Sequence, residues 1–204
     1  MSRGEIKAIL FDAYGTLCHM EVRRRPYRQL ARQVLDPIGF TKAVMTQPLG
    51  LMDAAHRGGL SLTPEQLAPL AQDLADELAG VRLYAEVSAV LGQLRAQGYR
   101  LGVVANLAQP YAEPVRQLLH DQLDLWCWSF ELGYPKPHPE LYRRVCQQLD
   151  LPPAAVLMVG DTRVEDYTGA KACGLQARWL RRRGTPQAEE EVASLSALAE
   201  QLLP

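Results

Sequence analysis

The sequence predicts an α/β protein with a doubly wound, mostly parallel sheet and a small all-helical cap. After residue 80, short apolar runs alternate with amphipathic stretches of helical spacing, which is the pattern of strands joined by covering helices. The run at residues 155–159 is apolar throughout, as is typical of a strand buried on both faces. Before residue 80, a long insert with helical spacing follows the first apolar run. We therefore expect an α/β core of residues 1–17 and 81–204 and a cap of residues 18–80.

The first strand is expected at residues 6–11, an apolar run that ends just before Asp12. The insert begins with a cluster of arginines on an expected helix, and a second helical stretch is expected after Thr41. These arginines are Arg23, Arg24, Arg25, Arg28 and Arg32. Residues 63–66 have the spacing of a capping box with proline at the first helical position. This box predicts a helix with an apolar face that runs to Gly80.

The rest of the chain is expected to alternate between helices and strands. Helices are expected around residues 87–94, after Pro110, over 139–149, between 161 and 173, and from about Glu189. Strands are expected at residues 99–105, 125–132, 155–159 and 175–180. This alternation is what predicts a parallel sheet covered by helices on both faces.

The composition is that of an ordinary globular protein, with 48% hydrophobic and 22% charged residues in 204. A net charge of −1 gives no reason to expect nucleic acid or a membrane surface as a partner. The cysteines at 18, 127, 146 and 173 form no CxxC pair, which favours reduced thiols over disulfides or a zinc site. The first apolar run is too short for a signal peptide or a spanning helix, so we expect a cytoplasmic protein.

Polar side chains follow four of the expected strands. Asp12 follows the first strand, Asn106 the second, Lys136 the third and Asp161 the fourth. In an open parallel sheet, ligands bind beyond the carboxyl ends of the strands. A single aspartate after a strand is usually a turn former or a helix cap. Four such groups at one edge predict a functional site there.

Three segments resemble the motifs of the haloacid dehalogenase (HAD) superfamily. Residues 12–17 (DAYGTL) look like its first motif, and residues 134–137 (YPKP) look like its third. Residues 160–166 (GDTRVED), followed by Gly169-Ala170, look like its fourth. The insert at residues 18–80 lies where this superfamily places a helical cap. The resemblance implies a Rossmann-like HAD core and a hydrolase.

The resemblance also implies a role for each matching residue. Asp12 would be the catalytic nucleophile, and Lys136 would be catalytic and would also bind the negative charge of the substrate. Asp161 and Asp166 would face Asp12, and three carboxylates repel one another unless a cation shares them. Their hard oxygen atoms indicate Mg²⁺. The superfamily adds one further metal ligand, the main-chain carbonyl of Tyr14.

The remaining candidates are polar supports of the substrate. Thr16 and Asn106 would bind the transferred group, but Thr16 could instead satisfy a turn and Asn106 could cap a helix or turn. Asp166 could likewise be only a charge at a helix terminus. The run Arg181-Arg182-Arg183 is interpreted as a solvated loop.

Two positions depart from the usual pattern of HAD phosphatases. Tyr14 stands where most of them have a second aspartate that protonates the leaving oxygen, and Ala105 replaces a Ser or Thr that donates to phosphate. Loss of a general acid costs a factor of about 10²–10⁴, and loss of one oxyanion donor about 10²–10³. We therefore expect a Mg²⁺-dependent phosphatase-type hydrolase with weakened chemistry, acting on a small phosphorylated molecule.

Two other functions stay open. DAYGTL also resembles the first motif of 2-haloacid dehalogenases, whose halide leaving group needs no proton and could be held by the cap arginines. Asp161 argues against this hypothesis. Those enzymes work without metal, and without a metal the Asp161 carboxylate would repel their carboxylate substrate. The third reading is a poorly catalytic phosphate-binding or interaction protein. The sequence predicts neither the substrate nor the oligomeric state.

Overall fold

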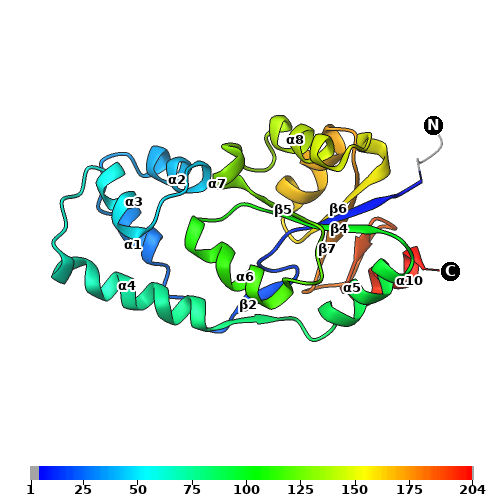
Figure 1. The fold of residues 1–204 in the computed structure, drawn as a ribbon, viewed down its shortest axis with the longest axis horizontal. Coiled ribbons are helices and arrows are strands. Elements are labelled where there is room, and N and C mark those ends of the chain that lie inside the picture. Colours follow the sequence, from blue (N-terminus) through cyan, green and yellow to red (C-terminus); the bar gives the residue numbers. More distant parts are fainter. Residues whose placement is uncertain (1–4, 204) are drawn as a thin grey trace.

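The computed structural model describes residues 5–203 and contains a six-stranded sheet (Figure 1). The strands are β1 (Ala8–Phe11), β4 (Arg100–Ala105), β5 (Leu125–Trp128), β6 (Val156–Gly160), β7 (Gln176–Leu180) and β8 (Glu191–Val192). Their order is β5-β4-β1-β6-β7-β8, and every neighbouring pair is parallel. In the fully buried β1, Ile9 is in register with Leu101 of β4 and Leu157 of β6. The predicted doubly wound parallel sheet is confirmed.

Helices cover both faces of this sheet. The first face carries α5 (Val87–Ala96), α6 (Ala112–Leu119) and α10 (Leu195–Leu202), and the second carries α8 (Pro139–Leu149) and α9 (Gly169–Ala172). Neighbouring residues of β1 point to opposite faces, so Phe11 lies in the first core and Leu10 in the second. In Figure 1, α8 lies above the sheet, and α5 and α10 lie below it.

Shorter turns complete these connections. The 3-10 helices η1 (Gln109–Tyr111) and η2 (Pro153–Ala155) precede α6 and β6, and the π-helix η3 (Arg163–Thr168) precedes α9. The chain builds one side of the sheet with β4 and β5 and the other side with β6, β7 and β8. The order of the strands therefore reverses between β1 and β6. Such a reversal opens a crevice at the carboxyl ends of these two strands, where ligands bind in this type of fold.

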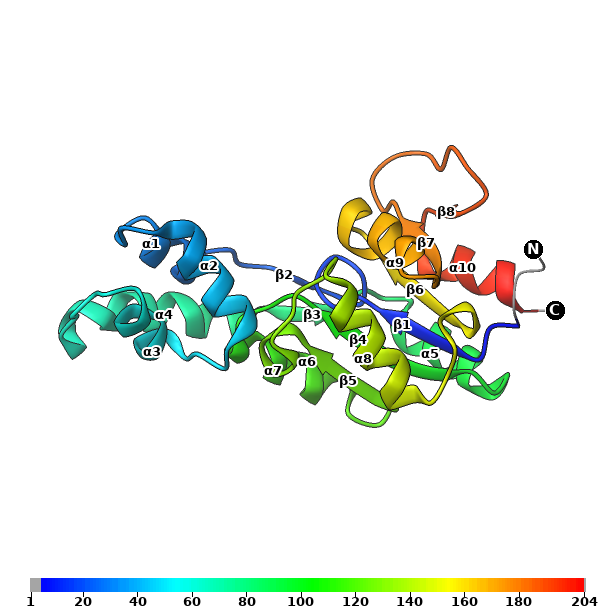
Figure 2. The same cartoon turned by 90° about the horizontal axis from the view of Figure 1, so that it is seen from above.

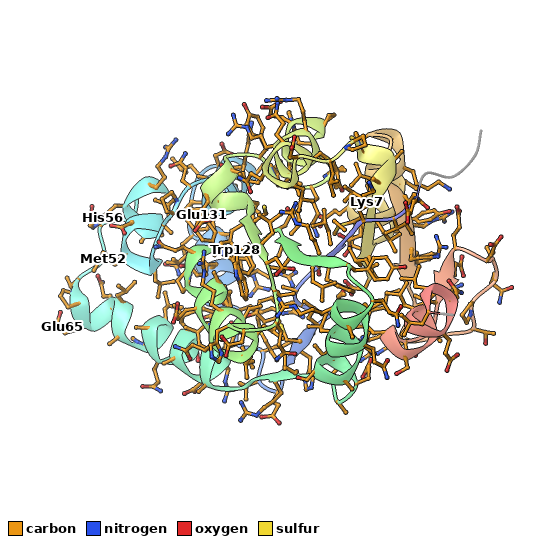
Figure 3. All side chains as sticks on the ribbon, turned by 45° about the vertical axis from the view of Figure 1, so that its right-hand side comes forward. Lys7, Met52, His56, Glu65, Trp128 and Glu131 are labelled. Carbon is orange, nitrogen blue, oxygen red and sulfur yellow. The ribbon has the colours of Figure 1, made fainter. Side chains whose placement is uncertain are left out.

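A group of four helices lies beyond this edge of the sheet (Figures 1 and 2). They are α1 (Pro26–Ala31), α2 (Pro37–Thr46), α3 (Leu51–Arg57) and α4 (Pro64–Ala79). They share a hydrophobic core of their own, which includes Leu30, Phe40 and Leu70. In Figure 3, His56 of α3 and Lys7, at the amino end of β1, lie on opposite sides of the molecule. The proposed division into core and cap at residues 17/18 and 80/81 stays a prediction.

The predicted cap is not helical at its first residues. Residues 18–20, expected in an all-helical segment, form β2 (Cys18–Met20), which pairs antiparallel with β3 (Val81–Leu83). This ribbon joins the four helices to the sheet. Its strands are separated by about 60 residues in the chain, so no local pattern indicates the pairing.

The helices of this segment also start at other residues than expected. The first begins at Pro26, so Arg23, Arg24 and Arg25 precede it, and the second begins at Pro37 rather than after Thr41. The Asp36 side chain caps this second helix by accepting the N–H of Gly39 at 2.9 Å. The capping box at Thr63 is confirmed, and it starts α4 where predicted.

Two predictions in the second half of the chain are wrong. The expected strand at 125–132 ends at Trp128 and continues as the short helix α7 (Ser129–Leu132), because a short apolar run suits either state. The helix expected from about Glu189 begins only at Leu195, after Ser194 accepts the N–H of Ala197 at 3.0 Å. The residues before it pair with β7 as β8.

Two predictions from composition can be compared with the structure. All four cysteines are free, as the spacing predicted. Within residues 5–203, no helix combines the length and the apolar character that crossing a bilayer requires.

Candidate active site

Asp12 lies at the carboxyl end of β1, in the middle of the sheet edge. Its backbone N–H donates to the carbonyl oxygen of Val159 in β6 at 2.9 Å, which extends the parallel ladder past the strand. Asp161 directly follows β6, and Asp166 lies on η3. One carboxylate oxygen from each of Asp12, Asp161 and Asp166 lies within 4.8 Å of the others. The structure therefore brings together the three aspartates predicted to share a metal.

Lys136 reaches this acidic cluster from the loop between α7 and α8. Its Nζ donates to Oδ1 of Asp12 at 2.7 Å and to Oδ1 of Asp166 at 2.6 Å, and the residue is only 2% exposed. Burial by itself lowers the pKa of this ammonium, but the two carboxylates outweigh burial and raise the pKa. Lys136 therefore stays charged and links two of the three aspartates.

Two glycines make room for the acidic cluster. A Cβ on Gly160 would lie 2.2 Å from the Asp166 carboxylate, and a Cβ on Gly15 would lie 2.3 Å from an Asp161 oxygen. Gly15 also has a φ of +98°, which residues with a side chain rarely adopt. The buried Asp166 is held further by the N–H of Thr162, which donates to Oδ2 at 2.9 Å. The glycines of the first and fourth motifs thus allow the carboxylates to approach the strand ends.

Asn106 uses its amide group to hold the loop that carries Lys136. Its Oδ1 accepts the Lys136 N–H at 2.7 Å, and its Nδ2 donates to the Lys136 carbonyl at 2.8 Å. The same Nδ2 donates to Oε2 of Glu165 at 3.0 Å. Both amide hydrogens are therefore used within the protein, and Asn106 positions Lys136. Its contact with substrate stays a prediction.

Thr16 is fully buried, and its hydroxyl has no hydrogen-bond partner within residues 5–203. The turn after β1 therefore does not use this hydroxyl, although the sequence allowed that role. A buried polar group without a partner costs about 1–3 kcal/mol. A contact between Thr16 and substrate stays a prediction.

The hydroxyl of Tyr14 is already engaged in a hydrogen bond to the backbone. The hydroxyl donates to the backbone carbonyl of Tyr111 at 2.8 Å, and the two rings pack edge to face with centroids 6.1 Å apart. Burial raises the pKa of the Tyr14 hydroxyl, and the nearby Cys18 and Glu77 raise it further. A hydroxyl that is harder to ionise and already donates to a carbonyl is a poor acid for a leaving group.

Arg182 is the site residue that the sequence interpretation missed. Its guanidinium donates to the carbonyl of Gly15 at 3.1 Å, to that of Thr16 at 2.6 Å, and to Oε1 of Glu86 at 2.6 Å. It also stacks on Tyr84, with its central carbon 3.6 Å from the ring centre. The interpretation of Arg181-Arg182-Arg183 as a solvated loop is therefore wrong for Arg182. Its partners Gly15 and Thr16, in the turn after β1, lie more than 160 residues away in the chain, so no local signal could reveal them.

The charge balance of the cluster fits a divalent cation. Burial is the largest effect on Asp12 and raises its pKa to about 7, with Lys136 opposing and Asp166 adding to the rise. When all three aspartates are ionised, the single ammonium of Lys136 leaves a net charge of −2. A divalent cation would balance this charge, and carboxylate oxygens are the ligands that Mg²⁺ prefers.

A cavity of about 650 Å³ opens between this cluster and the helices beyond it. Tyr14, Gly15 and Asp161 line the side toward the sheet, and residues of α1, α2 and α4 line the other side. Its size is typical of a small-molecule site. A molecule that reaches Asp161 through this cavity would also contact the helical segment.

Comparison with known proteins identifies the family. The family model described as haloacid dehalogenase-like hydrolase matches residues 6–174, which include every residue of the acidic cluster. The chain belongs to this family. It is therefore a HAD-family hydrolase, and the resemblance in the three motifs is confirmed.

Curated relatives of this HAD-family hydrolase include phosphatases. A phosphoglycolate phosphatase of Rhodospirillum rubrum is 32% identical, over 95% of this chain and 86% of that protein. An N-acetylmuramic acid 6-phosphate phosphatase of Pseudomonas aeruginosa is 31% identical, over 89% of this chain and 84% of that protein. These names support a phosphatase type over a dehalogenase type.

A solved structure also supports the HAD fold. The 2-haloacid dehalogenase of Pseudomonas syringae pv. Tomato DC3000 has a TM-score of 0.71, with 97% of this chain and 98% of that chain covered. Because its identity is only 22%, the similarity establishes the fold and not the activity.

Proposed function

We propose that this hydrolase is a Mg²⁺-dependent phosphatase that acts on small phosphorylated molecules with Asp12 as its nucleophile. The supporting observation is the ammonium of Lys136 placed between Asp12 and Asp166, with Asp161 beside them at the carboxyl ends of β1 and β6. Among its relatives are phosphatases named for phosphoglycolate and for N-acetylmuramic acid 6-phosphate. A carboxylate held beside an ammonium, with further carboxylates that can hold a cation, suits attack on a phosphate monoester.

The reaction would proceed in two steps. In the first, a carboxylate oxygen of Asp12 attacks phosphorus, and the bond to the alcohol oxygen breaks with its electron pair leaving on the alcohol. In the second, water attacks the acyl phosphate, which releases inorganic phosphate and restores the Asp12 carboxylate. Lys136 would keep Asp12 ionised and offset negative charge on the transferred group, since it already contacts Asp12 at 2.7 Å.

The metal would be held by Asp12, Asp161, Asp166 and the main-chain carbonyl of Tyr14. When bound, Mg²⁺ offsets negative charge on the transferred phosphoryl oxygens. The chemistry would be weakened at two places. Tyr14 supplies no acid to the leaving oxygen, and Ala105, at the end of β4, has no hydroxyl to donate to phosphate.

The remaining assignments follow from this function. Thr16 and Asn106 would support the transferred group, and residues 18–80 would act as a cap over the cavity. The absence of an apolar helix of spanning length within residues 5–203 is consistent with a cytoplasmic enzyme. Its substrate would be a small molecule rather than a nucleic acid or a membrane surface.

A 2-haloacid dehalogenase is the second candidate, and the Tyr14 position favours it. A halide leaves without a proton, so the engaged Tyr14 hydroxyl would be no disadvantage. Asp161 opposes this candidate, because its exposed carboxylate lines the cavity that a carboxylate substrate would have to enter. A poorly catalytic phosphate-binding or interaction protein is the third hypothesis.

The deciding experiment compares a panel of phosphate monoesters with 2-chloropropionate, each with Mg²⁺ and with a chelator. We expect turnover of phosphate esters only with Mg²⁺. Asp12→Asn should abolish this turnover because the amide is no nucleophile, while its similar shape preserves the fold. Dehalogenation in the presence of the chelator would replace the proposal with the second candidate. Activity that survives Asp12→Asn would exclude Asp12 as the nucleophile.

A further inference from the structure

Three of the five arginines near the start of the helical segment line the cavity above the acidic cluster. They are Arg23, Arg25 and Arg28, and the same cavity reaches Asp161. Arg24 and Arg32 belong to the same cluster in the sequence but are not part of its lining. The fold thus separates the five exposed arginines into two groups, three at the cavity and two away from it.

The three lining side chains are not neutralised by neighbouring acids. All three are exposed, and within residues 5–203 the structure pairs none of their guanidinium groups with a carboxylate. Glu77 also lines the cavity, but its Oε1 accepts the backbone N–H of Arg25 at 2.6 Å and its Oε2 accepts the hydroxyl of Tyr111 at 2.5 Å. The guanidinium groups therefore remain available to an anion.

The backbone that presents these arginines is held in a costly conformation. Arg25 has φ 59° and ψ 54°, the left-handed region that residues other than glycine seldom occupy. The next residue, Pro26, starts α1 and disfavours a right-handed helical conformation at Arg25. Glu77, which is 2% exposed, anchors the Arg25 N–H. A buried carboxylate from α4 therefore fixes the turn from which Arg23, Arg25 and Arg28 reach the cavity.

From these observations we propose that the cavity is a binding subsite for a second anionic group of the substrate. The inference rests on the proposed phosphatase function. The substrate is then a phosphate monoester whose alcohol portion carries a carboxylate or a second phosphate. The reacting phosphate lies at the acidic cluster, and the second anion lies against Arg23, Arg25 and Arg28. A contact between a guanidinium group and an anion is stronger where water is partly excluded, so the cavity would favour an anionic alcohol portion over a neutral one.

The test compares esters that differ only in the charge of the alcohol portion. 4-Carboxyphenyl phosphate and 4-carbamoylphenyl phosphate have similar shapes and phenolic leaving groups, so the missing acid at position 14 affects both alike. An analogue with a phosphonomethyl group in place of the carboxyl group tests a second phosphate-like anion. We expect kcat/KM to favour at least one of the two anionic esters over the carbamoyl ester by about tenfold or more. Whichever anion is preferred identifies the second group.

Two double variants with the same change in net charge provide the matched comparison. Arg25→Gln with Arg28→Gln should remove most of the preference for the anionic ester. Arg24→Gln with Arg32→Gln should leave that preference and the activity unchanged. Equal kcat/KM for the charged and neutral esters in the unmodified enzyme would overturn the proposal. An equal loss of preference in both double variants would overturn it as well, because a general field effect would then explain the selectivity.

A binding measurement separates this proposal from the proposed reaction. 4-Carboxybenzylphosphonate and its carbamoyl counterpart cannot be hydrolysed, and the rise in melting temperature that each causes with Mg²⁺ reports binding alone. We expect a larger rise with the carboxylate, or with the analogue that carries a phosphonomethyl group in its place, than with the carbamoyl compound, and we expect the difference to disappear in the Arg25/Arg28 double variant. Equal rises with all three compounds would overturn the subsite even if phosphate esters are hydrolysed. A larger rise without any hydrolysis would keep the subsite and reject the phosphatase.

Discussion

At the scale of single residues, the geometry of the first motif explains the expected weakness of catalysis. Tyr14 occupies the position of the usual acid, but its hydroxyl donates to the carbonyl of Tyr111, and burial raises its pKa. Ala105 is 2% exposed and contributes only a methyl group. Both features remove donors from the transferred group, while Asp12 and Lys136 keep their contact at 2.7 Å. The proposed nucleophile therefore keeps its contact with Lys136, and Tyr14 supplies no proton for the leaving group.

Replacement of Tyr14 by aspartate should restore a proton donor. We expect Tyr14→Asp to raise kcat/KM by about tenfold or more for alkyl phosphates, and much less for p-nitrophenyl phosphate, whose leaving group needs no proton. Ala105→Ser should help both substrates similarly, because its hydroxyl would contact phosphoryl oxygens. The measurement is kcat/KM of the unmodified enzyme, both single variants and the double variant, on one alkyl and one aryl ester. An equal gain on both esters in Tyr14→Asp would exclude the proposed role of position 14.

Arg182 should position the turn that follows the proposed nucleophile Asp12, because it holds the carbonyl groups of Gly15 and Thr16. A small displacement of a reacting group can lower the rate by about 10²-fold. We expect Arg182→Gln to lower kcat by about tenfold to a hundredfold with a smaller change in KM, and Arg182→Lys to recover part of the loss. The exposed Arg183 provides the control, as Arg183→Gln should leave kcat unchanged. A loss of stability without a change in kcat would reduce Arg182 to a structural role.

At the scale of elements, the ribbon of β2 and β3 and the capped helix α4 support the helical segment above the site. β2 and β3 form the ribbon that connects α1–α4 to the sheet, and Glu21 continues it by donating its N–H to the Gly80 carbonyl at 3.0 Å. The longest of these helices, α4, starts at the capping box of Thr63 and carries Glu77 near its end. Because Glu77 anchors Arg25, the stability of α4 contributes to the shape of the cavity.

Loss of the capping box should destabilise this part of the molecule. Thr63 accepts the N–H of Gln66 at 3.3 Å, and Gln66 accepts the N–H of Thr63 at 2.9 Å. We expect Thr63→Ala to lower the free energy of unfolding by about 1 kcal/mol. Thr46→Ala is the control, since Thr46 is the last residue of α2 and its hydroxyl only donates to a carbonyl four residues earlier. Urea denaturation of both variants measures the difference, and equal midpoints would show that the cap does not stabilise α4.

At the scale of the whole molecule, the topology of the sheet creates the site. The strand order reverses between β1 and β6, so Asp12 and Asp161 meet at one edge although they are far apart in the chain. Lys136 comes from a loop and Asp166 from η3 at the same edge, and they complete a cluster with more negative than positive charge. A cation that binds only the folded cluster should therefore stabilise the entire fold.

Mg²⁺ should accordingly raise the melting temperature. At a concentration a hundred times its dissociation constant, the ion would add about 2.7 kcal/mol, which is several degrees for a chain of this size. Asp161→Asn should remove most of this shift without lowering the metal-free melting temperature, because it also removes repulsion within the cluster. Asp121→Asn, on an exposed surface, should keep the shift. An unchanged shift in Asp161→Asn would place the ion elsewhere.

The sequence by itself determined the fold class, most helices and strands, and the position of Asp12 and Asp161 at strand ends. It could do so because hydrophobic periodicity is local, and because parallel strands bring their carboxyl ends to a common edge. It placed Lys136 after a strand, whereas Lys136 lies in the loop between α7 and α8. Only the tertiary structure decided the contacts of Arg182, the anchoring of Arg25 by Glu77, and the pairing of β2 with β3. The residues in the first two of these contacts are separated by 167 and 52 positions in the chain. Their meeting depends on how distant elements pack, and no short stretch of sequence contains that information.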